Sequence, residues 1–313
     1  MSVIEKLALT LDKEQREVER FLVNAPNKYK VYSIPKRTHG SRVIAQPSKE
    51  LKTYQRAFID LYEKYLPIHD NSFSYRKGVG IKQNADVHKK NPYLLKMDLE
   101  SFFNSIVPSM LWEEWERSIG NTPNAREKMW IERLLFWNPS KRSGGKLILS
   151  IGAPSSPMIS NFVMHSLDKV LSVECSEKGV SYTRYADDMT FSTRNKDTLF
   201  IFPELVSNII KSLFGNRISI NRSKTVYSSK AHNRHVTGVT LTNEGRLSLG
   251  RDRKRYIKHL VFEFREKRLD IDTFNHLKGL IAFAKYIEPD FIIRLEKKYS
   301  TRLIKKVMDG DYD

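Results

Sequence analysis

Two adjacent carboxylates, Asp187 and Asp188, stand in a segment whose other residues favour β-strands (SYTRYADDMTFST, residues 181–193). Because aromatic and β-branched residues flank them on both sides, the segment predicts a hairpin with the two aspartates at its tip. Burial and mutual repulsion raise the pKa values of such a pair unless cations lie between them. A third acid, Asp98, ends an apolar run at 93–97, where it would either cap a helix or join the pair. Three carboxylates on neighbouring strands would hold two Mg²⁺ ions about 4 Å apart, an arrangement suited to phosphoryl transfer.

The elements that must position these acids mix helix and strand along the chain. Polar–apolar alternation predicts a hairpin over residues 29–44, and residues 93–99 are typical of a strand. Ser48 is placed to cap a helix with an apolar face. Helical spacing also covers residues 1–26, about 108–118, about 124–136, about 157–165, about 203–214 and about 252–267. This order predicts an α+β core followed by a helical C-terminal lobe.

The net charge indicates an anionic partner. The 313 residues include 54 Lys and Arg against 36 Asp and Glu, which gives a formal net charge of +18 at pH 7. A surplus of that size favours nucleic acid as the partner, ahead of an acidic membrane surface. Much of it lies between Arg222 and Lys258, where aromatic residues and histidines are interleaved with the cations. That mixture suits phosphate contact combined with base stacking, although many basic runs are only solvated faces.

Cysteine content and hydropathy exclude other classes. A single cysteine, Cys175, excludes an internal disulfide framework and a zinc or iron–sulfur site built from several cysteines. No apolar run approaches the length of a membrane span, and the first residues do not have the pattern of a signal peptide. We therefore expect a cytoplasmic protein that does not act at a membrane.

Five short motifs, in order, resemble those of a known family. Asp98 in MDLESFF, the run GAPSSP at 152–157 and YADD at 185–188 resemble the palm motifs of reverse transcriptases. The segments NADVH at 84–88 and VTG at 236–238 are similar to signatures of the bacterial retron type. The resemblance extends from about Tyr29 to about Tyr299.

The resemblance implies an RNA-directed DNA polymerase with a right-hand fold of fingers, palm and thumb. On this reading residues 1–97 form an N-terminal helical segment and fingers. Residues 98–238 form a palm of antiparallel sheet and helices, with inserted finger helices at about 108–150. Residues 239–313 form a mainly helical thumb that binds RNA.

The same resemblance implies the catalytic roles. Asp98 and Asp187 would be the ligands of two Mg²⁺ ions, with the Leu99 carbonyl close to the second ion and Asp188 supporting from the same turn. The substrates would be deoxynucleoside triphosphates. The ions would activate the primer hydroxyl and stabilise the departing pyrophosphate.

Four further residues match nucleotide-binding positions of the family. Arg42 would contact the triphosphate, unless it is only a surface arginine of a hairpin. Phe103 would collide with a 2′-OH and so favour deoxynucleotides, or it is a core aromatic beside Phe102. Gly152 would allow close backbone approach to the base pair. Lys224 would protonate pyrophosphate, unless it is simply solvated.

One position departs from the family pattern. Ile151 stands where the pattern usually has Gln before Gly-x-Pro. The substitution removes a side-chain hydrogen bond near the nascent base pair. It affects fine contacts with template or nucleotide and leaves metal catalysis in place.

A third set of residues is expected to serve RNA binding. Asn84 and His88, four apart, lie on one face if their segment is helical, and would position structural RNA or the junction of fingers and palm. Cations at the start of a helix oppose its dipole, which indicates that an anion compensates them. These cations are Arg251, Arg253, Lys254, Arg255 and Lys258.

The retron resemblance also implies partners. The protein would bind its cognate noncoding RNA, start from a guanosine 2′-OH and leave a branched RNA–DNA product. It would serve defence against phage with a separate effector or toxin, and host RNase H would remove RNA. Two alternatives stay open: a reverse transcriptase of the group II intron or diversity-generating type, and a catalytically silent RNA-binding protein on the same scaffold.

Overall fold

The computed structural model describes residues 1–35 and 40–312. The chain divides into two compact units. The first contains Met1–Tyr75, Lys96–Met189 and Phe200–Thr225, and the second contains Arg76–Leu95, Thr190–Leu199 and Val226–Asp313. Neither unit is a continuous stretch of sequence, so residues far apart along the chain build each one.

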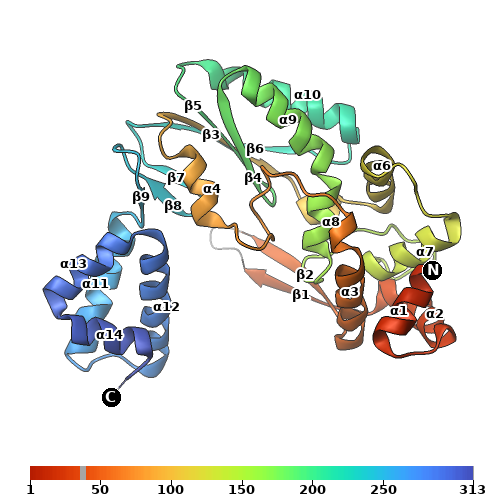
Figure 1. The fold of residues 1–313 in the computed structure, drawn as a ribbon, viewed down its shortest axis with the longest axis horizontal. Helices are drawn as coiled ribbons and strands as arrows, with labels where there is room; N and C mark the ends of the chain where they lie inside the picture. Colours follow the sequence, from red (N-terminus) through yellow and green to blue (C-terminus); the bar gives the residue numbers. More distant parts are fainter. Residues whose placement is uncertain (36–39, 313) are drawn as a thin grey trace. The chain divides into compact units, whose positions relative to one another are not determined.

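The first unit begins with short helices that gather near the N-terminus (Figure 1). They are α1 (Val3–Leu11), α2 (Gln15–Val23) and the 3₁₀ turn η1 (Ala25–Asn27), and they pack with α7 (Ala125–Leu135). The helical prediction over residues 1–26 is confirmed, with a break that the pattern did not indicate. Asp12 has a left-handed backbone, φ 51°, which ends α1 before α2 begins.

The predicted hairpin over residues 29–44 is confirmed. Strands β1 (Tyr29–Pro35) and β2 (Ser41–Pro47) pair antiparallel, with Tyr29 opposite Pro47 and Pro35 opposite Ser41. Its tip, residues 36–39, lies outside the described residues. The Ser48 hydroxyl then accepts a hydrogen bond from the Leu51 amide at 3.2 Å and caps α3 (Lys49–Tyr62), as the sequence predicts. The 3₁₀ turn η2 (Glu63–Tyr65) follows α3.

A four-stranded sheet positions the acidic residues. Its strand order is β4 (Val180–Tyr185), β5 (Asp188–Thr193), β3 (Tyr93–Leu99), β6 (Ile220–Ser229). The predicted strand at 93–99 and the predicted hairpin at 181–193 are confirmed, whereas β6 was not predicted as a strand. Strands β3, β5 and β6 each supply residues to both units.

Helices complete the first unit. They are α5 (Phe102–Ser105), α6 (Pro108–Ser118), α8 (Ser156–Val163), α9 (His165–Glu177) and α10 (Phe202–Phe214), with the 3₁₀ turn η3 (Thr198–Ile201) before α10. Helix α9 packs on β4 and α10, and α6 packs on α8 and α9. The mixed helix and sheet content agrees with the predicted α+β class.

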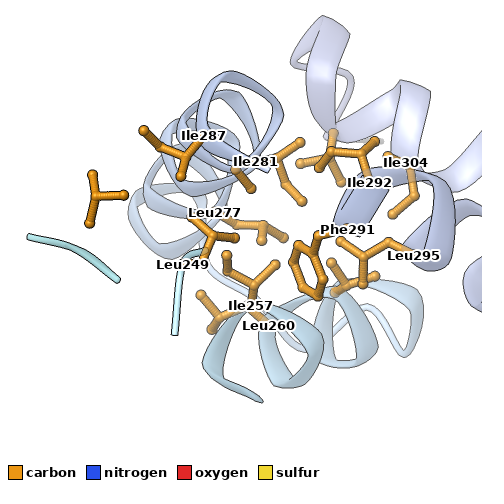
Figure 2. Packing of buried hydrophobic residues seen from close by; sticks show 14 of the residues in the cluster. Leu249, Ile257, Leu260, Leu277, Ile281, Ile287, Phe291, Ile292, Leu295 and Ile304 are labelled. Atoms are coloured by element: carbon orange, nitrogen blue, oxygen red, sulfur yellow. The ribbon is translucent and has the colours of Figure 1, made fainter. Parts of the chain in front are cut away.

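The second unit combines a small sheet with a helical bundle. Strands β7 (Arg234–Val236), β8 (Val239–Leu241) and β9 (Leu247–Ser248) form an antiparallel sheet on which α4 (Ile81–His88) packs. The bundle consists of α11 (Arg251–Arg265), α12 (Ile271–Ile287), α13 (Pro289–Tyr299) and α14 (Thr301–Asp309). Figure 2 shows Ile257, Leu277 and Phe291 pointing into the space between these helices. Apolar burial of this kind is the main source of stability in such a bundle.

Within residues 1–35 and 40–312, no helix combines the length and the apolar composition that crossing a membrane requires.

Candidate active site

The turn between β4 and β5 lies beside the end of β3. The Leu99 amide donates a hydrogen bond to the Asp187 carbonyl at 3.0 Å, which ties the strand that carries Asp98 to the turn that carries Asp187. The turn consists of Ala186 and Asp187, and Asp188 is the first residue of β5. The structure therefore brings Asp98, Asp187 and Asp188 together at one end of neighbouring strands, within the first unit.

The carboxyl groups of Asp98, Asp187 and Asp188 interact electrostatically. Burial raises the pKa of Asp187, and the charge of Asp98 raises it further. Burial and the charges of Asp187 and Asp98 raise the pKa of Asp188 to about 6. Lys224 and Arg42 act in the opposite direction on Asp187. Burial is thus the main cause of both shifts, and the neighbouring carboxylates add to it.

The Asp98 carboxylate forms an ion pair with a lysine. Lys224, on the strand next to β3, donates to Oδ1 at 2.8 Å and to Oδ2 at 2.9 Å. The hydrogen bond to Asp98 raises the pKa of Lys224, so the ammonium stays protonated at neutral pH. Asp98 is 7% exposed, and the side chain of Lys224 is 59% exposed. The ammonium thus occupies a position where a cation is required, yet its exposure leaves it free to move away.

The donor set fits a divalent ion. Carboxylate oxygens are hard ligands of the kind that Mg²⁺ and Mn²⁺ prefer. The pKa values of Asp187 and Asp188 are raised, and a bound divalent ion would stabilise both groups in their charged form. Among the residues that the structure describes, no three His, Cys, Asp or Glu side chains already stand in the arrangement of a metal site. Both oxygens of Asp98 are directed at the Lys224 ammonium.

A cavity of about 320 Å³ belongs to the same unit. Phe103 and Tyr75 line it, with ring centroids 6.4 Å apart, and the Gly152–Pro154 segment lines it as well. Phe103 is half-buried, whereas the neighbouring Phe102 is buried in the core. Of the two interpretations of Phe103, this placement favours the one in which the ring faces a ligand.

Gly152 approaches protein backbone closely. With φ at 124°, it lies where an added Cβ would be 3.3 Å from the Ala45 carbonyl oxygen, and the Ala45 amide bonds to the Ile151 carbonyl at 3.0 Å. This close contact joins the loop to β2. From the sequence, Gly152 was expected to allow close approach of the backbone to a base pair. Arg42 lies exposed on β2, opposite Ile34.

Lys52, Arg56 and Tyr75 also line the cavity and were not identified from the sequence. Lys52 and Arg56 extend from α3, four residues apart and therefore on one helix face. That spacing could have been found in the sequence. Tyr75 could not, because it lies in an irregular segment and has a left-handed backbone with φ 58°.

The residues expected to bind RNA fall into two groups. Asn84 and His88 are buried inside the second unit, where His88 Nδ1 lies 2.7 Å from the Ser192 hydroxyl and Asn84 donates to Thr237 at 3.4 Å. Burial lowers the pKa of His88 to about 3, so the ring is neutral. Both side chains are therefore in the interior of the second unit, and of the two roles expected from the sequence, positioning structural RNA or the junction of fingers and palm, neither requires an exposed side chain.

The basic residues of α11 differ in their surroundings. Arg251, Arg255 and Lys258 are exposed. Arg253 instead donates to the Gly238 carbonyl at 3.2 Å, and Lys254 pairs with Glu288 at 2.7 Å. Three of the five predicted cations are therefore open to an anionic partner, while two already stabilise the second unit.

Comparison with known proteins adds independent findings. Residues 34–241 match the family model described as reverse transcriptase (RNA-dependent DNA polymerase). The chain is 49% identical over 299 residues to the Retron Ec83 reverse transcriptase of Escherichia coli, covering 95% of this chain and 96% of that relative. It is 29% identical over 294 residues to the Retron Ec73 reverse transcriptase of Escherichia coli, covering 89% of each. Among solved structures, telomerase from Candida albicans in complex with a fragment of telomeric RNA aligns with a TM-score of 0.47 at 14% identity, covering 95% of this chain and 63% of that chain.

Proposed function

The chain belongs to the reverse transcriptase family, and within it to the bacterial retron type, and from this premise we propose how its site works and what it makes. It is an RNA-directed DNA polymerase with the right-hand fold of that family. The proposal is that it copies part of a cognate structured noncoding RNA into single-stranded DNA. The observation that supports this most is the grouping of Asp98 with the Asp187–Asp188 turn.

The catalytic roles are those that the resemblance implies, and the donor set fits them. Asp98 and Asp187 would hold two Mg²⁺ ions, with the Leu99 carbonyl and Asp188 assisting. When bound, the ions supply activation of the primer hydroxyl and charge stabilisation of the leaving pyrophosphate. Lys224 remains protonated through its contact with Asp98 and, once released, has a proton to give to pyrophosphate.

Substrate selection involves the cavity of the first unit. The Phe103 ring excludes a nucleotide 2′-OH by contact, which favours deoxynucleoside triphosphates. The exposed guanidinium of Arg42 offers several donors to a triphosphate. Ile151 lines the same cavity and places an apolar side chain where the family pattern has Gln.

The larger assignments rest on the retron resemblance of the sequence motifs. Residues 1–97 correspond to the N-terminal segment and fingers, 98–238 to the palm, and 239–313 to the thumb. The thumb recognises RNA through Arg251, Arg255 and Lys258. The product is a branched RNA–DNA molecule primed from a guanosine 2′-OH. In the cytoplasm the protein acts with a separate effector in defence against phage, and host RNase H removes the copied RNA.

Purification from the native host, followed by sequencing of the bound nucleic acid, tests this proposal. Covalently joined RNA and DNA should accompany the wild-type protein. Asp187→Asn combined with Asp188→Asn should retain RNA and lose all DNA. The double substitution Asp60→Asn with Asp309→Asn, at exposed helical positions, makes the same change in net charge and should behave as wild type.

Two results would contradict the proposal. RNA without DNA in the wild-type protein would favour the catalytically silent RNA-binding alternative. Linear DNA that is not joined to RNA would favour a reverse transcriptase of another lineage.

A further inference from the structure

Ala186, which precedes the metal-binding Asp187, has an unusual backbone conformation. Its φ is 56°, in the left-handed region. A positive φ at the first central position of a two-residue hairpin turn is usually supplied by glycine. Alanine has neither the freedom of glycine nor a polar side chain that bonds locally. Such a conformation persists only where surrounding contacts determine it.

Both polar backbone groups of Ala186 are held by side chains from elsewhere in the first unit. Its amide donates to the Ser74 hydroxyl at 2.9 Å, and its carbonyl accepts from Arg184 Nη1 at 3.0 Å. Ser74 and Arg184 are both fully buried. The carbonyl of Asp187 is held as well, by the Leu99 amide. The turn is thus fixed from three directions.

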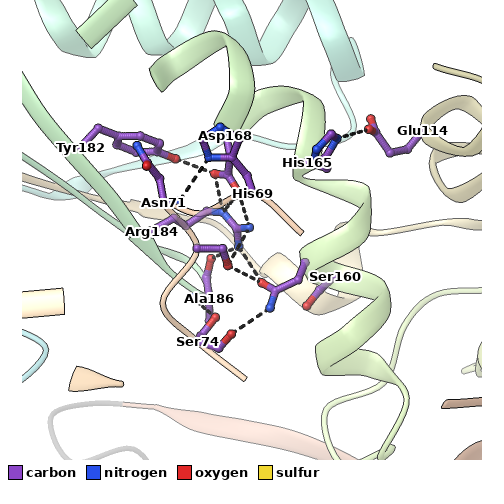
Figure 3. A network of polar contacts seen from close by, with 12 residues as sticks. His69, Asn71, Ser74, Glu114, Ser160, His165, Asp168, Tyr182, Arg184 and Ala186 are labelled. Carbon is purple, nitrogen blue, oxygen red and sulfur yellow. Dashed lines mark hydrogen bonds and ion pairs between the residues drawn. The ribbon is translucent and has the colours of Figure 1, made fainter. Parts of the chain in front are cut away.

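Arg184 is itself fixed by a buried carboxylate. Asp168 of α9 accepts from its Nε at 2.8 and 3.1 Å and from its Nη2 at 2.6 Å. Asp168 Oδ1 also accepts from the Tyr182 hydroxyl at 2.8 Å. Figure 3 shows this arrangement, with Asp168, Arg184 and Ala186 in sequence toward the turn. The rigid fork of the guanidinium lets one side face Asp168 while Nη1 reaches Ala186.

Ser74 is fixed in a similar way. Asn161 of α8 donates to the Ser74 carbonyl at 2.9 Å. The segment before Ser74 runs beside β4. There the Arg184 amide donates to the Asn71 carbonyl, and the Phe73 amide donates to the Arg184 carbonyl. The position of the Ser74 hydroxyl is therefore set by β4 and α8 together.

We propose that Arg184, Asp168 and Ser74 are positioning residues for DNA synthesis, which hold the Ala186 peptide so that the Asp187 carboxylate faces the metal ions. The inference rests on the role proposed above for Asp187. Stability alone does not explain the arrangement, because well-packed apolar side chains often replace a buried ion pair without loss of stability. Two contacts of this network instead end on the residue next to a metal ligand. A small displacement there changes rate far more than folding.

Two buried serines of the first unit provide a matched test. Ser74→Ala removes the acceptor of the Ala186 amide. Ser160→Ala, also at a fully buried position, removes a hydroxyl that donates to the Pro157 carbonyl at 2.9 Å. Each variant is compared with wild type in primer extension on a synthetic RNA template. Mn²⁺ binding to the protein alone, by electron paramagnetic resonance, and thermal unfolding complete the comparison.

Ser74→Ala should lower kcat by about 10- to 100-fold with little change in the KM for nucleotide. It should also weaken Mn²⁺ binding, while Ser160→Ala stays within about twofold of wild type in kcat and in Mn²⁺ affinity. The two variants should have similar unfolding temperatures. Arg184→Lys keeps the charge beside Asp168 but lacks the fork, so it should reproduce the kcat and Mn²⁺ defects of Ser74→Ala.

The proposal is overturned if Ser74→Ala keeps the wild-type kcat and Mn²⁺ affinity. It is also overturned if both serine variants lose activity equally and in proportion to their unfolding temperatures. Absence of DNA synthesis by wild type would instead contradict the proposed function. In that case the Mn²⁺ measurement would still decide whether Ser74 positions the turn.

Discussion

Replacing Lys224 with methionine removes the ammonium that donates to both oxygens of Asp98. Truncating one partner of a fully buried ion pair destabilises a protein by roughly 3–5 kcal/mol. The side chain of Lys224 is largely exposed, so water replaces part of the lost contact. We expect a loss of about 1–2 kcal/mol for the metal-free protein, close to the value of one hydrogen bond to a charged group. For a unit of this size, that lowers the unfolding temperature by about 2–8 °C.

A divalent ion should reverse this difference. In wild type the ion must displace the lysine from Asp98, whereas in Lys224→Met it meets a carboxylate with no such competitor. Because ligand binding stabilises the folded state in proportion to ln(1 + [L]/Kd), the variant should gain more stability from added Mn²⁺. Thermal unfolding over a Mn²⁺ titration measures this gain. Lys211→Met, at an exposed position of α10, is the matched control.

Equal unfolding temperatures of Lys224→Met and wild type without metal would show that the ion pair does not stabilise the first unit. A constant difference between them at every Mn²⁺ concentration would show that Lys224 does not compete with the ion for Asp98.

Three further predictions concern pH, folding and RNA. Asp188 has a folded-state pKa of about 6, above its ordinary value of 3.8, so its contribution to stability is complete below about pH 4 and is lost as pH rises through 6. Asp188→Asn should therefore raise the unfolding temperature of the metal-free protein more at pH 7.5 than at pH 5, and equal shifts would contradict the assigned cause. Ser48→Ala should destabilise the first unit by about 1 kcal/mol in urea unfolding through loss of the α3 cap, and an unchanged midpoint would show that the cap contributes nothing. Arg255→Gln should weaken RNA binding at low salt and reduce the slope of log K against log salt by about 0.7–0.9. Arg253→Gln should change the slope less, because Arg253 already contacts the Gly238 carbonyl. Equal effects of the two substitutions would contradict this difference between Arg255 and Arg253.

The elements around the acids could be predicted because their signals are local. The β4–β5 hairpin follows from strand-forming residues on both sides of the turn, and α3 follows from Ser48 and an apolar stripe. The break at Asp12 was missed because helical spacing in the flanking residues does not indicate a left-handed residue between them.

The site was only partly predictable, for a different reason. That Asp98 and Asp187 belong together came from family motifs, since spacing along one chain does not show which strands become neighbours. Burial was also invisible in the sequence: the four-residue spacing of Asn84 and His88 placed them on one face of a helix but did not show that this face lies in the interior. The contact between Arg184 and Ala186 depends on Asp168, whose partners come from β4, and no sequence pattern joins them.

Asp98 and Asp187 are proposed to bind the same divalent ions. Anomalous scattering from Mn²⁺ in crystals of the protein with an RNA template, a DNA primer and a non-reactive nucleotide tests this directly. We expect Mn²⁺ about 2.0–2.2 Å from carboxylate oxygens of both residues, with Lys224 moved away from Asp98. Mn²⁺ bound elsewhere, with the Lys224–Asp98 ion pair intact beside the nucleotide, would contradict it.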